Sequence, residues 1–186
     1  MQLESNDLRA AKRILAKLVD DALLEYERNL ADLDEDSNLE ALLNHLFLQL
    51  KSLLGDILVE ALSILDEQSI QIYTYENSEL AEIQIRRQQC KSSIWLFPRV
   101  NYCTCTQFKV GVLGLPDELQ PASQTSHSEK LERIITCAHV LALRLAQLLH
   151  PSPSTFKVES VSEQQFKSLQ ERMHSSFIEI HEDSTD

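Results

Sequence analysis

Two short motifs in this sequence bring together residue types that bind metal ions. Cys103 and Cys105 form a Cys-x-Cys pair, and Cys137 and His139 form a Cys-x-His pair further along the chain. Three thiolates and one imidazole are a common ligand set of tetrahedral zinc sites that serve structure. The sequence therefore predicts one zinc ion held by these four residues.

The spacing within each pair predicts the local backbone that must present it. Residues two apart on a strand point to the same side, so Cys103 and Cys105 can chelate together at the end of a β element. Residues two apart on a helix point in different directions, so Cys137 and His139 can share a metal only at a helix start. We therefore expect regular helix to begin near Cys137 and residues 131–136 to be irregular.

A simpler interpretation is that these cysteines are buried thiols, because cysteine is among the most frequently buried residue types. One Cys-x-Cys pair alone would favour that interpretation, but a second pair at a helix start favours metal binding. Four protein ligands leave no position for a water molecule, which favours a structural site over a catalytic one. A bound zinc ion then contributes on the order of 10 kcal/mol to folding.

Other metal-ligand residue types lie outside this pattern. Cys90 is interpreted as a separate thiol and His127 as a loop histidine. The sequence contains three glycines and no glycine-rich phosphate loop, which argues against nucleotide hydrolysis. No HExxH helix or comparable general acid-base motif accompanies the cysteines, so we expect no enzyme and no small-molecule substrate.

The charge of the chain is strongly negative but unevenly distributed. The net charge of −12 argues against strong autonomous DNA binding. Between Ile83 and Gly114 there is no acidic residue, and the basic residues there are Arg86, Arg87, Lys91, Arg99 and Lys109. This segment is either a solvated face or a patch that contacts nucleic acid or an acidic partner.

Aromatic residues occur in the same segment. They are Trp95, Phe97, Tyr102 and Phe108. Aromatic side chains beside basic ones can stack on exposed bases, and the same side chains can instead fill a small β core. We favour the core.

Hydrophobic periodicity predicts the elements that position these residues. Helices are expected over residues 8–33 and 38–65, with a bend or close contact at Gly55, and a further helix ends near residue 149. Alternating patterns predict strands over residues 69–75, 80–85 and 93–97, and residues 115–128 read as a loop. Residues 161–177 form one more helix or belong to a disordered tail.

Together these elements predict an α+β fold with N-terminal helices, a small antiparallel sheet and a C-terminal helix. Three regions follow: a helical region 1–66, a β-rich region 67–150 that carries the metal ligands, and a polar acidic tail 151–186. The residues from Met1 to Asp7 lack the features of a leader, and no apolar run is long enough to span a bilayer. We therefore expect a reducing compartment, the nucleus or also the cytoplasm, and no membrane partner.

The combination of Cys103-Thr104-Cys105 with Cys137-Ala138-His139 resembles the SWIM-type zinc finger. The flanking sequences over residues 65–70 and 137–142, with Phe108 between them, are similar to the SWIM-domain subunit of the Shu complex. The resemblance covers about residues 40–150. The loop between the two ligand pairs is long here, and both ends of the chain carry extensions. The resemblance implies that the metal site belongs to a ββα unit.

The resemblance also implies a function without catalysis. Members of this family pair with a divergent paralogue of the RecA-type recombinase. The pair promotes assembly or stability of recombinase filaments on single-stranded DNA during homologous recombination, in repair and in meiosis. Ala142 matches a family alanine implicated in partner contact. The alternatives are a SWIM adaptor in ubiquitin ligation or a direct DNA-binding factor, and a metalloenzyme ranks third.

Overall fold

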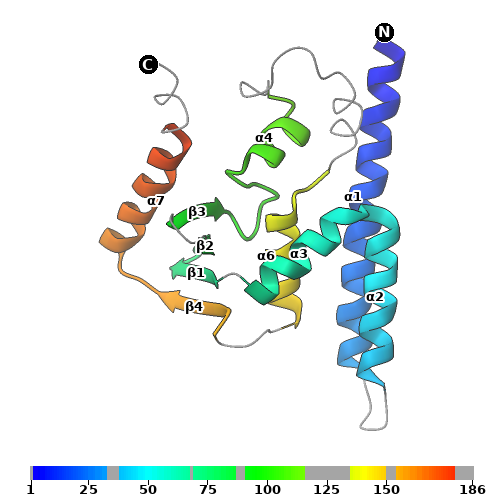
Figure 1. Ribbon diagram of the computed structural model, residues 1–186, viewed down its shortest axis with the longest axis horizontal. Helices are drawn as coiled ribbons and strands as arrows, with labels where there is room; N and C mark the ends of the chain where they lie inside the picture. Colours follow the sequence, from blue (N-terminus) through cyan, green and yellow to red (C-terminus); the bar gives the residue numbers. More distant parts are fainter. Residues whose placement is uncertain are drawn as a thin grey trace.

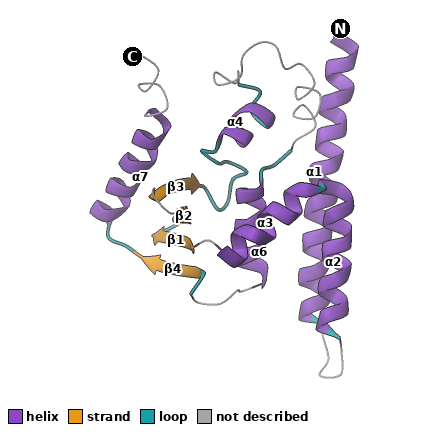
Figure 2. Ribbon diagram, viewed as in Figure 1, coloured by secondary structure: helices purple, strands orange, loops and turns teal. Residues whose placement is uncertain are grey.

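A computed structural model describes residues 2–32, 38–67, 69–86, 91–115, 135–149 and 154–178. Over these residues the fold is α+β, with six helices and one four-stranded sheet (Figures 1 and 2). The helices are α1 (Gln2–Ala31), α2 (Leu39–Leu54), α3 (Asp56–Glu67), α4 (Thr106–Gly111), α6 (Ala138–Leu149) and α7 (Glu163–Ile178). The strands are β1 (Ser69–Tyr75), β2 (Ser78–Arg86), β3 (Lys91–Leu96) and β4 (Phe156–Ser160). None of the described helices has both the length and the apolar content needed to cross a bilayer.

The first two helices form an antiparallel hairpin at one side of the molecule (Figure 1). On α1 the buried positions Val19, Leu23 and Tyr26 follow the three- and four-residue steps of one helix face. They belong to the same core cluster as Leu46 and Leu50 of α2. The chain enters α2 through an N-cap, where the Asn38 side-chain oxygen accepts a hydrogen bond from the Ala41 amide at 3.1 Å.

The helix expected over residues 38–65 is two helices, separated at Gly55. This glycine has φ 58° and ψ −125°, and its amide donates to the carbonyl of Lys51 at 2.9 Å. A Cβ placed there would have no neighbouring atom within 4 Å, so the position does not need glycine for close packing. The backbone conformation itself, which residues with a side chain rarely adopt, requires glycine and ends α2.

The sheet has the strand order β3-β2-β1-β4. β1 and β2 form an antiparallel hairpin, and β3 adds to β2 in antiparallel orientation, as expected. β4 pairs with β1 in parallel, with Ile72 opposite Val158. The prediction of a purely antiparallel sheet is therefore wrong, and the sheet is mixed. β4 is an edge strand of five residues whose side chains lie largely in solvent, and its apolar alternation is limited to Phe156 and Val158, which is too short to predict a strand.

Helices cover both faces of the sheet. In Figure 1, α7 lies on one side of the strands, and α3 and α6 lie between the strands and the α1–α2 hairpin. The main core contains Ile70, Ile83 and Leu96 from the sheet together with most of α6, and a smaller cluster contains Leu80, Trp95, Phe166 and Met173. The sheet thus separates two hydrophobic clusters, and α6 is buried in the larger one.

A buried carboxylate helps to fix α7 on the sheet. Glu82 of β2 is only 2% exposed and accepts hydrogen bonds from the Tyr73 hydroxyl, at 2.9 Å, and from the Ser93 hydroxyl. Arg172 of α7 lies 3.7 Å from the same carboxylate and 5.5 Å from the centre of the Trp95 ring. Burial, with the hydrogen bond to Glu82 adding to it, raises the pKa of Tyr73. The phenol therefore remains a hydrogen-bond donor over the ordinary pH range.

Replacing Gly55 by alanine tests the helix break. Because a Cβ makes the positive φ unfavourable, G55A is expected to lower the free energy of unfolding by about 1–3 kcal/mol. The measurement is urea unfolding followed by circular dichroism. Ser52→Ala, at an exposed position of α2, is the control and is expected to change stability by less than about 0.5 kcal/mol. Equal stabilities for the two variants would contradict the conformational account.

Candidate metal centre

The Cys-x-Cys pair is held by backbone pairing beyond the end of β3. Cys103 forms an isolated antiparallel bridge with Leu96. The Thr104 amide donates to the carbonyl of Trp95, and the Trp95 amide donates to the Thr104 hydroxyl, each at 3.0 Å. These two hydrogen bonds fix Thr104 beside β3. The cysteines on either side of Thr104 are therefore held close to each other. This arrangement agrees with the prediction that the pair sits at the end of a β element.

Both Cys105 and Cys137 sit at helix starts. Cys105 is the N-cap of α4, and its sulfur accepts the Phe108 amide at 3.4 Å. Cys137 directly precedes α6, and its carbonyl accepts the Leu141 amide at 3.1 Å. The expectation that regular helix begins near Cys137 is confirmed. Residues 135 and 136 are not helical, whereas residues 131–134 lie outside the described part of the chain.

Asn101 connects the two ligand pairs and was missed by sequence reasoning. Its side-chain amide donates to the carbonyl of Ile135 at 3.0 Å, and its side-chain oxygen accepts the Thr136 hydroxyl at 3.3 Å. The residues before Cys137 are thus tied to the turn before Cys103. A single asparagine in a loop carries no sequence signal for such a role, because its partners are distant in the chain.

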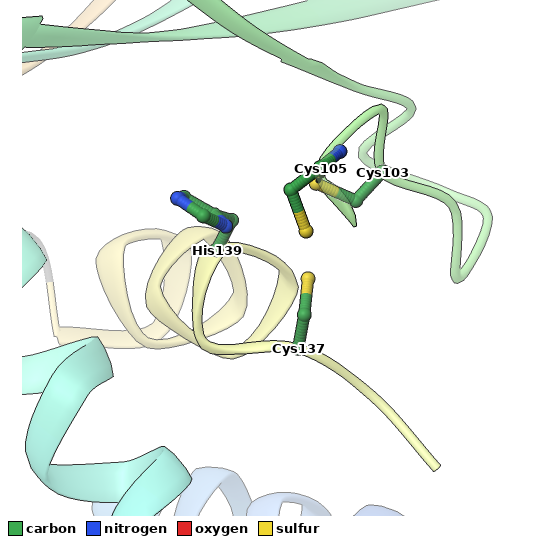
Figure 3. A group of neighbouring side chains, drawn as sticks. All are labelled: Cys103, Cys105, Cys137 and His139. Carbon is green, nitrogen blue, oxygen red and sulfur yellow. Dashed lines mark hydrogen bonds between the residues drawn. The ribbon is translucent and has the colours of Figure 1, made fainter. Parts of the chain in front are cut away.

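The four ligand residues converge at one point between the sheet and α6. Figure 3 shows the side chains of Cys103, Cys105, Cys137 and His139 gathered around a common space. Their potential ligand atoms all lie within 4.8 Å of one another. The three cysteines are 0–8% exposed, and His139 is half-buried. The arrangement can hold one metal ion.

Two features of the side chains fit a metal ion at this point. The His139 Nδ1 atom is buried and has no hydrogen-bond partner among the described residues, which is costly for a polar nitrogen. The three thiols also shift one another's pKa values. Hydrogen bonds from Cys103 and then Cys137 lower the pKa of Cys105, while donation to Cys105 raises the pKa of Cys103. Protein groups alone therefore stabilise one thiolate, and a cation is needed for all three to ionise together.

The chemistry available to this centre is that of a cross-link. Four protein donors would fill the coordination positions of an ion that takes four ligands, and such an ion would supply a structural cross-link. The ligands come from the extension of β3, the start of α4 and the start of α6. An ion held here joins segments that are separated in sequence by the loop between the two pairs.

The remaining residues singled out from the sequence have different positions. Ala142 of α6 is fully buried in the main core rather than on the surface. Trp95 and Phe108 are buried at 2% and 0% exposure, in agreement with the core interpretation. The rings of Phe97, Tyr102 and Phe108 form a chain, with centroid separations of 5.5 Å and 5.8 Å.

The basic segment found in the sequence is described only in part. Arg99 is exposed and pairs with Glu79 at 3.0 Å, and Lys109 lies on α4. Cys90, Arg87 and His127 fall outside the described residues, as do the side chains of Arg86 and Lys91.

Neither models of known protein families nor curated proteins match this sequence.

Replacing Cys137 by serine tests the centre directly. We expect C137S to lose the bound metal and to unfold at a lower temperature, because one thiolate is removed and two buried thiols lose their shared cation. The measurements are metal content by mass spectrometry and thermal unfolding by circular dichroism. Cys90→Ser removes the cysteine outside the predicted ligand set and should retain the metal. Loss of metal in C90S with retention in C137S would contradict the assignment.

Proposed function

We propose that this chain is a non-enzymatic zinc-finger adaptor of the SWIM class. In this proposal it pairs in the nucleus with a divergent RecA-type recombinase paralogue. The pair promotes recombinase filament assembly or stability on single-stranded DNA, in repair and in meiosis. The observation that carries the proposal is the buried convergence of Cys103, Cys105, Cys137 and His139.

The donor set supports zinc as the metal. Thiolate and imidazole together suit a borderline-soft cation, and zinc accepts three sulfurs and one nitrogen in a tetrahedron without a preference for another geometry. Zinc is not redox-active, which suits a site surrounded by thiols. When bound, it supplies a fixed cross-link, while this chain's own backbone orients the ligands through the contacts of Thr104, Phe108 and Asn101.

The order of elements supports a ββα unit around the metal. β2 and β3 are antiparallel neighbours, the Cys-x-Cys pair follows β3, and the Cys-x-His pair begins α6. This is the order expected of a SWIM finger. Between the two pairs this chain also contains the short helix α4, which is an addition to that pattern.

Ala142 enters this proposal as a packing residue. Its side chain is 0% exposed, so a partner cannot touch it without opening the core. Ala61 of α3 is equally buried, and α3 and α6 pack against each other. A small residue at position 142 permits close approach of helices at the centre of the fold. Any effect of this position on a partner is therefore transmitted through the placement of α6.

The first test concerns the metal. Purified chain is expected to contain one zinc ion per molecule, and exchange for cobalt should give the visible spectrum of a tetrahedral site with sulfur ligands. Chelation at neutral pH should lower the melting temperature, since metal binding is coupled to folding. A chain that folds with the same stability with and without chelator would contradict a structural zinc ion.

The second test concerns the partner. Tagged chain purified from its native cells is expected to retain a RecA-type recombinase paralogue in near-equal amount, as determined by mass spectrometry. Cys103→Ser should abolish this pairing, because the surface organised by the metal is lost. A folded C103S variant that still binds the paralogue would refute the role of zinc. Recovery of ubiquitin-ligase subunits instead would preserve the finger and reject the recombination function.

A further inference from the structure

The N-terminal half of α1 carries an exposed row of cations. Arg9, Arg13 and Lys17 follow one another at four-residue steps and are all exposed. Four-residue steps place side chains on the same side of a helix, about 6 Å apart at Cβ. No acidic residue occurs between Asp7 and Asp20. Within the described part of the chain, none of these three cations forms an ion pair.

Arg9 and Arg13 lie on a part of α1 that projects beyond α2, and Lys17 lies at the base of that part. α1 has 30 residues and α2 has 16, which correspond to about 45 Å and about 24 Å of helix. The fully buried positions of α1 begin only at Val19. Figure 1 shows the N-terminal end of α1 continuing past the end of α2. The cations are therefore accessible along the side of an extended rod.

At its inner end the row leads to two more arginines. One turn beyond Lys17, the carboxylate of Asp20 is paired with Arg144 of α6 at 2.7 Å. Asp20, Arg144 and Arg99 line one surface cavity of about 370 Å³. Asp20 is thus compensated, whereas the exposed Asp21, which continues the four-residue steps after Lys17, ends the row. Both arginines are exposed enough, at 37% and 69% of the side chain, to exchange one anionic partner for another.

The net charge of the whole chain does not decide the local interaction. The chain carries −12, but at about 0.15 M salt the Debye length is about 8 Å. Acidic residues farther than this from the row are largely screened from a ligand bound along it. A polyanion that lies along Arg9, Arg13 and Lys17 therefore interacts mainly with those cations, and with Asp21 at the inner end of the row.

We propose that this row binds the sugar-phosphate backbone of a nucleic acid strand. Backbone recognition needs regularly spaced cations and no apolar pocket. The exposed apolar residues Ile14 and Leu18 lie beside the row, and Ile14 stands three residues before Lys17. Along the four-residue steps of the row itself only cations occur, so the row lacks the apolar centre of a typical protein interface. The proposed function assigns DNA contact to no particular member of the pair, whereas here this chain makes one itself.

The test is binding of labelled oligothymidine to the full-length, metal-loaded chain, measured by fluorescence anisotropy between about 50 mM and about 200 mM salt. The variant is R9Q/R13Q/K17Q. The matched control K51Q/K157Q/K167Q removes three exposed cations from α2, β4 and α7. Circular dichroism and metal content show whether each variant is folded, and the partner test above remains a separate readout.

The wild type should bind with an affinity that falls as salt rises. The row variant should bind about tenfold or more weakly, with a salt slope smaller by about 2, because three phosphate contacts to a single strand are lost. The control should match the wild type. The proposal is overturned if the wild type does not bind, if the row variant binds as the wild type does, or if both variants weaken equally. It is also overturned if polyglutamate competes as well as oligothymidine, since the occupant would then be an acidic protein.

Discussion

The constraint on which the rest of this structure depends is the meeting of three thiols and an imidazole in a buried space. Neutral thiols are buried at little cost, but an unpartnered imidazole nitrogen is costly to bury, and three neighbouring thiolates are stable there only around a cation. Their convergence requires Cys103 to extend the sheet, and it requires Cys105 and Cys137 to stand at helix starts. The positions of Cys103 beyond β3 and of the starts of α4 and α6 meet these requirements. The hydrogen bonds of Asn101 then join the two sides of the site through protein groups alone.

The sequence predicted this centre well because ligand spacing is a local property. A Cys-x-His pair cannot share a metal from the middle of a helix, so the start of α6 followed from Cys137 and His139. Longer-range features were less accessible. β4 was missed because its pairing with β1 depends on a distant segment and its own side chains are mostly exposed. At Gly55 the sequence predicted a bend or a close contact and not the end of a helix. The presence of a glycine does not by itself specify the backbone angles that the residue adopts.

Net charge was likewise an incomplete guide to where this chain could bind a polyanion. The net charge of −12 argued against DNA binding. The basic segment after Ile83 was the sequence's candidate for contact with nucleic acid or an acidic partner. The more regular arrangement of cations lies on α1, which was interpreted from the sequence only as an amphipathic helix. Its significance depends on how far α2 covers α1, and that depends on where two separate helices end. Composition averages over such differences, whereas a ligand senses only the charges within about one Debye length.

The metal centre and the cationic row are physically connected. Cys105 caps α4 at one end, and at the other end the carbonyl of Gly111 accepts a hydrogen bond from the Lys12 ammonium of α1 at 3.4 Å. A cation at the carboxyl end of a helix is favourable, so this contact holds α1 against α4. α4 has only six residues and is too short to be stable alone, so its position depends on the Cys105 N-cap and on the burial of Phe108 in the main core. The ligand set at one end of α4 therefore contributes to the support of α1 at Lys12, which lies between Arg9 and Arg13 of the cationic row.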